Sequence, residues 1–289
     1  MKEKKIKKTW KNKKIYLCIF WIILAIYISI ILLGRQIETS FSFPFTVYQK
    51  VTRTEPFSIT DSNGKKISAV YIDKHSDKTI FYFHGNGENL QKIEDDLLFI
   101  SNNFGVNVLC YDYPWYWESK DSPYYENISN ISKIFYNFLV DEKKIKKQNI
   151  ILWGYSIWWA VAIDLASKVE FGKLIITSSF TSRYDMSKAM IGFVAQNFLL
   201  LPNSFVSEEK IKNIKVPTLI MHGNKDKLVP YFMGQRLFQN SGANKKMFVE
   251  IDKSWHNWIL MNYWEELKPI IENFLNDNFE NKQILKIWE

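Results

Sequence analysis

An apolar run meets a serine and then a helix-like segment in Ile150-Ile-Leu-Trp-Gly154-Tyr-Ser156-Ile-Trp158-Trp159-Ala160. A strand, a sharp turn that carries a serine and a following helix form the context of a nucleophile elbow. Such a turn lifts the serine hydroxyl off the end of a sheet and directs the next backbone N–H groups, at the helix N-terminus, toward an oxyanion. The stretch therefore predicts Ser156 as a candidate nucleophile.

The motif around this serine is incomplete. A nucleophile elbow is expected to carry Gly-x-Ser-x-Gly, and the last glycine is replaced here by Trp158. A solvated serine at an ordinary strand-to-helix turn explains the short motif equally well. The rest of the chain must therefore decide between these two interpretations.

The composition favours one large domain or two small ones with an ample core, because 47% of the 289 residues are hydrophobic. The formal charge of +8 is concentrated in residues 1–14, which hold eight lysines and one glutamate, so the remainder is nearly neutral. A near-neutral body is not typical of a nucleic-acid-binding protein. Cys18 and Cys110 lie in different apolar runs, so they indicate neither a disulfide framework nor a zinc site.

Residues 15–34 form an uncharged apolar run directly after the lysine-rich tail. A helix of this length, at about 1.5 Å rise per residue, spans the roughly 30 Å of a bilayer core. The run is longer than the apolar region of a usual signal peptide, and no small-residue cleavage site follows it, so we expect an uncleaved anchor. A core helix is disfavoured because no face of the run is polar.

The flanking charges predict the orientation of this anchor. The lysines precede the run and only Arg35 lies just after it. The positive-inside rule then puts the N-terminus in the cytoplasm and the body on the extracytoplasmic side. The predicted organisation is a basic cytoplasmic tail at 1–14, a transmembrane anchor at 15–34, a linker at 35–55 and one domain at 56–289.

The domain begins with a hairpin pattern and then alternates strands with helices. Residues 57–60 and 66–72 flank an Asn-Gly turn and predict a β-hairpin. Further strands are expected at 79–84, 106–113, 149–155, 173–178, 217–222 and 246–251, with helices near 89–102, 123–140, 157–168, 230–240 and 262–277. This order predicts an α/β fold with a mostly parallel sheet and helices on both faces.

A loop rich in small residues, His84-Gly85-Asn86-Gly87-Glu88, follows the first strand of the alternating region. In an acyl-transfer site such a loop supplies the second oxyanion donor, beside the N–H group that follows the nucleophile. We therefore assign the two donors to the backbone N–H groups of Asn86 and Ile157. An ordinary glycine-rich loop is the alternative, and the sequence lacks the glycine spacing of phosphate-binding loops.

A serine nucleophile needs a base, and the sequence has four histidines. His256 follows the last strand of the alternating series, at the edge of the sheet where the serine turn lies. A carboxylate must fix the tautomer of this histidine and stabilise its cation. Asp226 lies in the loop after the preceding strand, and Asp252, four residues before His256, is the competing carboxylate. The order Ser156, Asp226, His256 predicts a catalytic triad.

Together these motifs resemble the alpha/beta-hydrolase superfamily. The similarity rests on Phe81-Tyr-Phe-His-Gly-Asn-Gly, Tyr111-Asp-Tyr-Pro, Gly154-Tyr-Ser, the block from Val216 to Pro230, and His256. It covers about residues 56–278 and looks most like the membrane-anchored, single-domain branch of thioesterases, esterases and lysophospholipase-like enzymes. The resemblance implies an alpha/beta-hydrolase fold, Ser156, Asp226 and His256 as catalytic residues, and no metal or organic cofactor.

The predicted function is a membrane-anchored serine hydrolase that cleaves acyl esters or thioesters through an acyl-enzyme. The expected partners are an acyl ester or thioester, such as a lipid or an acylated protein, and the membrane. An insert at 180–215 carries apolar residues at roughly helical spacing. That pattern is typical either of a cap over an acyl pocket or of a helix packed on the sheet.

Several tryptophans stand where the family has a glycine or another small residue. Trp115, Trp117, Trp158 and Trp159 occupy family glycine positions, and Trp255 precedes the histidine at a position that is commonly small. A side chain of this size at Trp158 is expected to clash where the elbow presses helix against strand. These tryptophans favour an alternative function, a catalytically inactive hydrolase fold that serves as a membrane interaction protein.

The composition suggests a genetic origin for these tryptophans. The chain has 11 tryptophans and 11 glycines, whereas average usage of about 7% would give roughly 20 glycines. Its excess of lysine over arginine is expected of an AT-rich gene. Some bacterial lineages read UGA as glycine, while other codes read it as tryptophan. We hypothesise that these five tryptophans are glycine in the natural protein, with Trp153 a true tryptophan.

Overall fold

The computed structural model describes residues 2–42, 53–61, 64–113, 125–192, 206–257 and 259–288. Its centre is a nine-stranded sheet in the order β1-β2-β4-β3-β5-β6-β7-β8-β9. The β1–β2 and β2–β4 pairs are antiparallel, and the other pairs are parallel. This is the mostly parallel α/β sheet that the sequence predicts.

The strands are β1 (Phe57–Thr60), β2 (Lys66–Ile72), β3 (Thr79–Phe83), β4 (Asn107–Tyr111), β5 (Ile150–Tyr155), β6 (Lys173–Thr177), β7 (Thr218–Gly223), β8 (Lys246–Ile251) and β9 (Gln283–Ile287). The predicted hairpin and the six strands that follow it are confirmed. β9 was not expected. It pairs with β8 in parallel and places Ile287 opposite Ile251, so it extends the sheet by one edge strand.

The helices are α1 (Lys2–Ser42), α2 (Leu90–Phe104), α3 (Tyr125–Asn137), α4 (Trp159–Ala166), α5 (Arg183–Ile191), α7 (Ser207–Ile211), α8 (Tyr231–Asn240), α9 (Ile259–Asn262) and α10 (Trp264–Leu275). A π-helical turn, Phe138–Glu142, continues α3, and short 3₁₀ turns cover Lys147–Asn149 and Ser156–Trp158. Each predicted helical segment therefore contains a helix in the structure.

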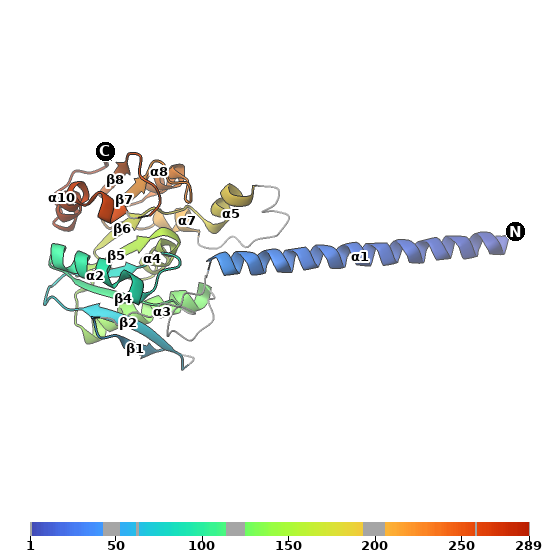
Figure 1. Ribbon diagram of the computed structural model, residues 1–289, viewed down its shortest axis with the longest axis horizontal. Helices are drawn as coiled ribbons and strands as arrows, with labels where there is room; N and C mark the ends of the chain where they lie inside the picture. The colour runs from blue at the N-terminus through green and yellow to red at the C-terminus, as the bar shows by residue number, and fades with distance from the viewer. Residues whose placement is uncertain are drawn as a thin grey trace.

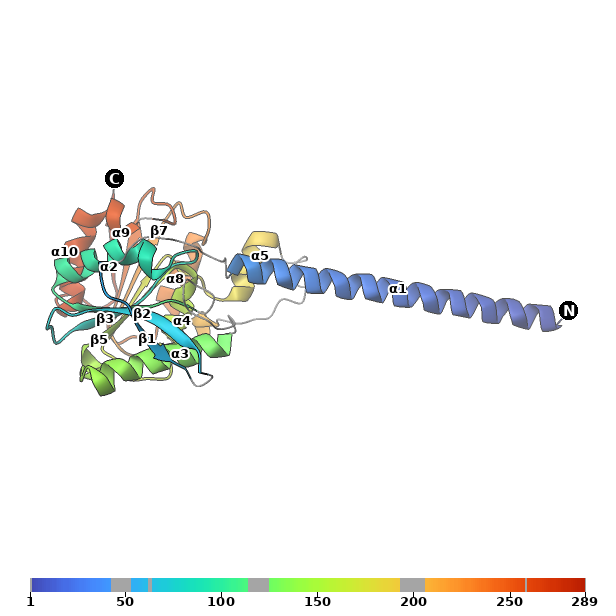
Figure 2. The ribbon, with the colours of Figure 1, turned by 60° about the horizontal axis from the view of Figure 1, so that its bottom comes forward.

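Helices cover both faces of the sheet, as Figures 1 and 2 show. One apolar core lies between the sheet and the helices α3, α4, α7 and α8, and a second lies under α2, α9 and α10. Successive side chains of β5 point to opposite faces of the sheet. Ile150 and Leu152 therefore lie in the first core, and Ile151 and Trp153 lie in the second. Because both faces of the sheet are covered, the middle residues of β3 to β8 are mostly apolar, whereas the edge strand β9 mixes polar and apolar residues.

The N-terminal helix α1 projects from the body as one long rod (Figure 1). Its segment Lys13–Leu33 has a mean hydropathy of 2.8 and is long and apolar enough to cross a membrane. The helix extends beyond both ends of the predicted anchor, into residues expected as tail and linker. No proline interrupts it, since the first proline of the sequence is Pro44. α1 is therefore a candidate membrane span.

The predicted insert at 180–215 is described in part, at 180–192 and 206–215. α5 begins at Ser182, whose side chain accepts a hydrogen bond from the backbone N–H of Asp185. Met186 packs against the first core, whereas Met190 is exposed. Residues 193–201, which carry most of the apolar pattern, lie outside the described residues, so the cap stays a prediction.

Candidate active site

Ser156 lies at the sharp turn between β5 and α4. Its φ of +56° is in the left-handed region that serine rarely adopts, and this strain is typical of a nucleophile elbow. Two residues earlier, Gly154 approaches α4 so closely that a Cβ there would lie 2.4 Å from the Cα of Trp159. Only glycine fits this contact. The turn therefore holds the Ser156 hydroxyl at the C-terminal edge of the sheet.

The structure brings the three predicted polar side chains together at this edge. The Ser156 Oγ lies 2.7 Å from the Nε2 of His256, and the Nδ1 of His256 lies 2.7 Å from the Oδ2 of Asp226. All three residues are buried. When the N–H group at Nδ1 donates a hydrogen bond to Asp226, the unprotonated Nε2 can accept the serine proton.

Asp226 is held ionised by its surroundings. Its Oδ1 accepts the backbone N–H groups of Leu228 and Val229 at 2.9 and 2.8 Å. Burial pushes the pKa of Asp226 upward, but hydrogen bonds from His222 and His256 outweigh it and leave the pKa well below its usual range. The Nε2 of His222 lies 3.4 Å from the Asp226 Oδ2 and 3.0 Å from the carbonyl of Val229. Asp226 therefore stays a carboxylate.

The competing carboxylate faces elsewhere. Asp252 accepts a hydrogen bond at 2.7 Å from the side-chain amide of Asn224, and its own backbone N–H donates to Ile287 of β9. Of the two candidate carboxylates, Asp226 is therefore the one that contacts His256.

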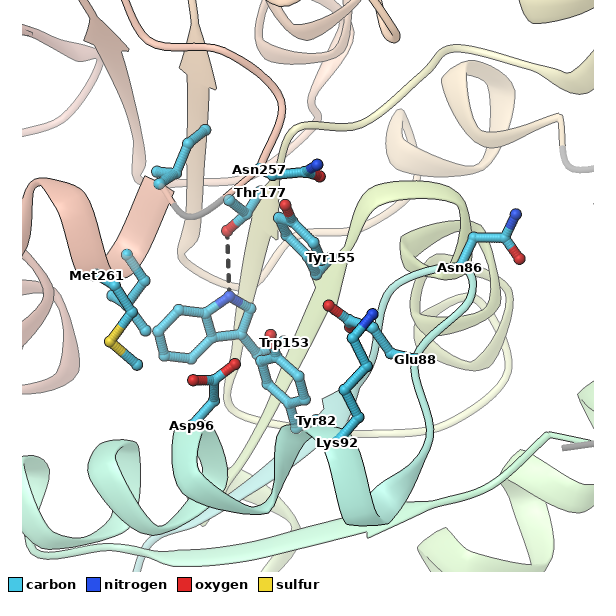
Figure 3. Close-up of a pocket in the computed structure, with 12 residues that line it drawn as sticks. Tyr82, Asn86, Glu88, Lys92, Asp96, Trp153, Tyr155, Thr177, Asn257 and Met261 are labelled. Carbon is cyan, nitrogen blue, oxygen red and sulfur yellow. Dashed lines mark hydrogen bonds between the residues drawn. The ribbon is translucent and has the colours of Figure 1, made fainter. Parts of the chain in front are cut away.

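The loop after β3 is folded into a tight turn beside the elbow. The backbone N–H of Gly85 donates to the Oε2 of Glu88 at 2.6 Å, and the N–H of Glu88 lies 3.4 Å from the carbonyl of Gly85. Gly87 takes a φ of +72°, which favours glycine. Asn86 stands at the apex of this turn, and its side chain points away from Glu88 (Figure 3). The roles of the Asn86 and Ile157 N–H groups as oxyanion donors remain predictions.

Sequence reasoning missed two residues that support this arrangement. The hydroxyl of Tyr155 donates to the carbonyl of His256 at 2.8 Å and so ties the elbow to the histidine loop. Glu88 braces the Gly85 turn, and burial raises the pKa of its carboxyl. The capping-box pattern gives no signal for Glu88, because α2 begins at Leu90 with Asn89 as its N-cap and Gly85 lies in the loop before it. Nothing in the sequence singles out Tyr155.

The remaining histidines take other places. His84 is fully buried, its Nδ1 donates to the carbonyl of Gly85 at 3.0 Å, and burial lowers its pKa to about 4. His75 is exposed, near Asp73. Within the described part of the chain, no three His, Cys, Asp or Glu side chains gather as a metal site would require.

The two tryptophans of the elbow are buried. The Trp158 indole stacks on Tyr113, with ring centroids 3.8 Å apart, so the expected clash does not occur. The tight point is instead the backbone of Trp159 against Gly154. The Nε1 of Trp159 is buried and finds no hydrogen-bond partner among the described residues. Trp255 is exposed, and Trp115 and Trp117 lie outside the described residues.

The substitution of tryptophan for glycine stays a hypothesis. Because both elbow indoles are packed in a core, removing them from this structure would leave cavities that cost about 3–5 kcal/mol for each large side chain. A clash at the elbow would mean that the chain folds poorly and that Trp158→Gly with Trp159→Gly restores folding, and the packing of both indoles in the core does not support this expectation. The codons at these positions and the masses of peptides from the native protein decide the matter, since UGG codons would end the hypothesis.

Three comparisons place the chain among known proteins. Residues 204–261, which contain Asp226 and His256, match the family model described as serine aminopeptidase, S33. A putative alpha/beta hydrolase of Acanthamoeba polyphaga mimivirus is 27% identical over 236 residues, which cover 79% of this chain and 86% of that protein. The human alpha/beta hydrolase domain-containing protein 17B is 25% identical over 225 residues, 76% of each chain.

Solved structures show the same fold. An esterase of Pyrococcus furiosus superposes with a TM-score of 0.69 at 20% identity, covering 82% of this chain and 96% of that one. A monoacylglycerol lipase of Paleococcus ferrophilus superposes with a TM-score of 0.56 at 17% identity, covering 74% and 99%. The sheet order, the strained serine turn and these relatives define an alpha/beta-hydrolase fold. The family match, the relatives named as alpha/beta hydrolases and the esterase structures support an alpha/beta-hydrolase superfamily hydrolase.

Proposed function

We propose that this protein is a membrane-anchored serine hydrolase that cleaves acyl esters or thioesters. The observation that carries the proposal is the continuous line from the Ser156 Oγ to His256 and on to Asp226, with both contacts at 2.7 Å. A strained serine at the head of a helix, aligned with a histidine and an ionised carboxylate, is the arrangement that activates a serine hydroxyl.

In the proposed mechanism His256 Nε2 takes the Ser156 proton as Oγ bonds to the acyl carbonyl carbon. The backbone N–H groups of Asn86 and Ile157 hold the resulting oxyanion. The carbonyl re-forms, the bond to the leaving oxygen or sulfur breaks, and the leaving group takes the proton from His256. Water then attacks the acyl carbon while His256 accepts its proton. The bond from the acyl carbon to Ser156 Oγ breaks, His256 returns the proton to Oγ, and the acid is released. Asp226 stabilises the imidazolium in both halves.

A fluorophosphonate probe tests this function on the full chain in detergent micelles. We expect an adduct on the peptide that contains Ser156, and none in Ser156→Ala. Ser254→Ala is the matched control, because Ser254 is a second buried serine near the site, with its Oγ 3.2 Å from the carbonyl of Trp255. The control should label like the unchanged protein. Absence of labelling at Ser156 in folded protein would contradict the proposal.

The anchor and its orientation form part of the proposal. They are supported by the apolar α1 segment Lys13–Leu33 and by the lysines that precede it. Protease added to spheroplasts should digest the C-terminal domain, and its full protection would reverse the orientation.

A catalytically inactive hydrolase fold with a membrane-bound interaction role is the second candidate. It is favoured by Trp158 and Trp159 at family glycine positions beside the serine turn. The probe separates the two candidates, because an inactive fold would leave Ser156 unlabelled while the protein stays folded.

A further inference from the structure

A cavity of about 170 Å³ opens beside the candidate active site (Figure 3). Its lining includes Asn86 of the turn after β3, Tyr155 directly before Ser156, and Asn257 directly after His256. Three segments that carry proposed catalytic groups thus each contribute a residue to the lining, and Asn86 is itself a proposed oxyanion donor. The cavity therefore adjoins the candidate site through residues next to Ser156 and His256, while Ser156, Asp226 and His256 are not among the residues that line it.

The size of the cavity limits its occupant. An apolar cavity of about 150 Å³ holds one benzene molecule, so this space of about 170 Å³ has room for about one compact group. It is therefore matched to the far end of a short leaving group.

The wall of the cavity is aromatic. Tyr82, Trp153 and Tyr155 line it, and the rings of Tyr82 and Trp153 meet edge to face with centroids 5.9 Å apart. The indole of Trp153 is fixed because its Nε1 donates to the Thr177 Oγ1 at 3.2 Å. Aromatic faces attract cations through the negative potential above the ring. A fixed aromatic wall is therefore suited to an alkylammonium group.

A half-buried carboxylate, Asp96, faces this wall. Figure 3 shows its side chain pointing toward the indole of Trp153, while the ammonium of Lys92 lies beside Glu88. No hydrogen bond or ion pair within the described residues involves the Asp96 carboxylate. Burial alone raises its pKa, whereas Lys92 acts on the pKa of Glu88. The cavity thus holds one acid that its own lysine does not neutralise.

We propose that this cavity binds the alkylammonium end of a short amino-alcohol leaving group, with Asp96 as the counter-ion and Tyr82 and Trp153 as the aromatic wall. The leaving-group role rests on the proposed hydrolase function, but the ammonium site itself does not. In turnover the released amino alcohol leaves with the proton from His256, and Asp96 takes no part in the bond changes. Asp96 is therefore a specificity-determining residue.

Binding of choline and of 3,3-dimethyl-1-butanol, its neutral isostere, tests the site by calorimetry on the full chain in detergent micelles. We expect choline to bind about tenfold tighter than the neutral alcohol, and Asp96→Asn to remove this preference. Asp95→Asn is the matched control, because the neighbouring carboxylate lies outside the cavity and pairs with Arg53. Equal binding of the two probes to the unchanged protein would overturn the ammonium site.

Turnover of butyrylcholine and of 3,3-dimethylbutyl butyrate tests the leaving-group role. We expect Asp96→Asn to lower kcat/KM for the cationic ester about tenfold and to leave the neutral ester unchanged, with unaltered thermal unfolding. An equal loss on both esters would overturn the proposal. Choline binding that depends on Asp96, with no turnover of either ester and no labelling of Ser156, would refute the hydrolase function and the leaving-group role but support the ammonium site.

A lipid headgroup carries the same ammonium chemistry farther from its ester bond. Lysophosphatidylcholine and lysophosphatidylglycerol form the second arm of the experiment. We expect Asp96→Asn to leave their ratio of rates unchanged, since the phosphate and glycerol separate the ammonium from the ester. A drop in this ratio would overturn the short leaving group in favour of a lipid headgroup.

Discussion

Two of the histidine–aspartate pairs at the C-terminal edge of the sheet, His256 with Asp226 and His84 with Asp112, differ in their spacing and in their neighbours. In the first, His256 Nδ1 is 2.7 Å from Asp226, and its other nitrogen is 2.7 Å from the hydroxyl of Ser156. In the second, His84 Nε2 is 3.6 Å from Asp112, and the His84 ring packs on Tyr113. Only the first pair has a nucleophile in line with it.

The second pair, His84 with Asp112, is the more deeply enclosed of the two. His84 and Asp112 are fully buried, and burial lowers the pKa of His84 to about 4, so this ring stays neutral at pH 7. Asp112 accepts the backbone N–H of Leu90 at the start of α2. A histidine next to an aspartate is thus a buried structural element at His84 and the proposed proton-transfer group at His256. The difference lies in the third partner and in access to substrate.

Removal of the serine or of the histidine that lies in line with it should have the largest effect on turnover. Ser156→Ala and His256→Ala should each lower kcat/KM by about 10⁴-fold or more, and the double variant should lose little beyond either single change, because the groups act as one unit. His84→Asn should act chiefly on stability and lower the free energy of unfolding by about 1–3 kcal/mol. Ester hydrolysis and thermal unfolding of the four proteins provide the check. If the loss of kcat/KM in the double variant equalled the product of the two single losses, Ser156 and His256 would not act as one unit.

The carboxylate of the in-line pair should rank next. Asp226→Asn should lower kcat by about 10⁴-fold, because an amide favours the wrong histidine tautomer. Asp252→Asn is the matched control and should retain near-full turnover, since Asp252 contacts Asn224 instead of the histidine. Near-full activity of Asp226→Asn would show that His256 works without this partner.

The brace of the turn after β3 should have a smaller effect. Glu88→Gln removes the charge that accepts the Gly85 N–H and should lower kcat about tenfold to a hundredfold with little change in KM, because loss of a whole oxyanion donor costs about 10²–10³. Steady-state kinetics on a p-nitrophenyl ester measures both constants. A rise in KM at constant kcat would assign Glu88 to substrate binding instead.

The smallest effect concerns stability in acid. The pKa of Asp226 lies well below its unfolded value of about 3.9, so its ionised form stabilises the fold fully above that value and loses this contribution as the pH falls toward the folded pKa. The difference in free energy of unfolding between the unchanged protein and Asp226→Asn should therefore narrow from pH 6 to pH 3. Chemical denaturation at each pH measures this difference, and a constant value would contradict the electrostatic account.

The strand pattern could be predicted from the sequence because buried parallel strands are short apolar runs between turn residues. The edge strand β9 was missed, since Gln283–Ile287 mixes polar and apolar residues and only its pairing with β8 makes it a strand. The length of α1 was underestimated because charge and hydropathy mark a membrane span but not where a helix ends.

Residue type and order along the chain were the two features from which the candidate site could be predicted. Those features and the family resemblance selected Ser156, Asp226 and His256, with Asp252 as the competing carboxylate. The structure adds that Asp226 contacts His256 whereas Asp252 contacts Asn224. The contacts of Tyr155 and Asp96 were not predictable, because the cavity forms between segments far apart in the chain.

Trapping of the acyl-enzyme tests the central claim most directly. The full chain is mixed with p-nitrophenyl butyrate, quenched in acid within the first turnover and digested for peptide mass analysis. The account predicts a butyryl group on Ser156, formed with a burst of p-nitrophenol and absent from both Ser156→Ala and His256→Ala. Turnover without this adduct, or a butyryl group on another residue, would contradict it.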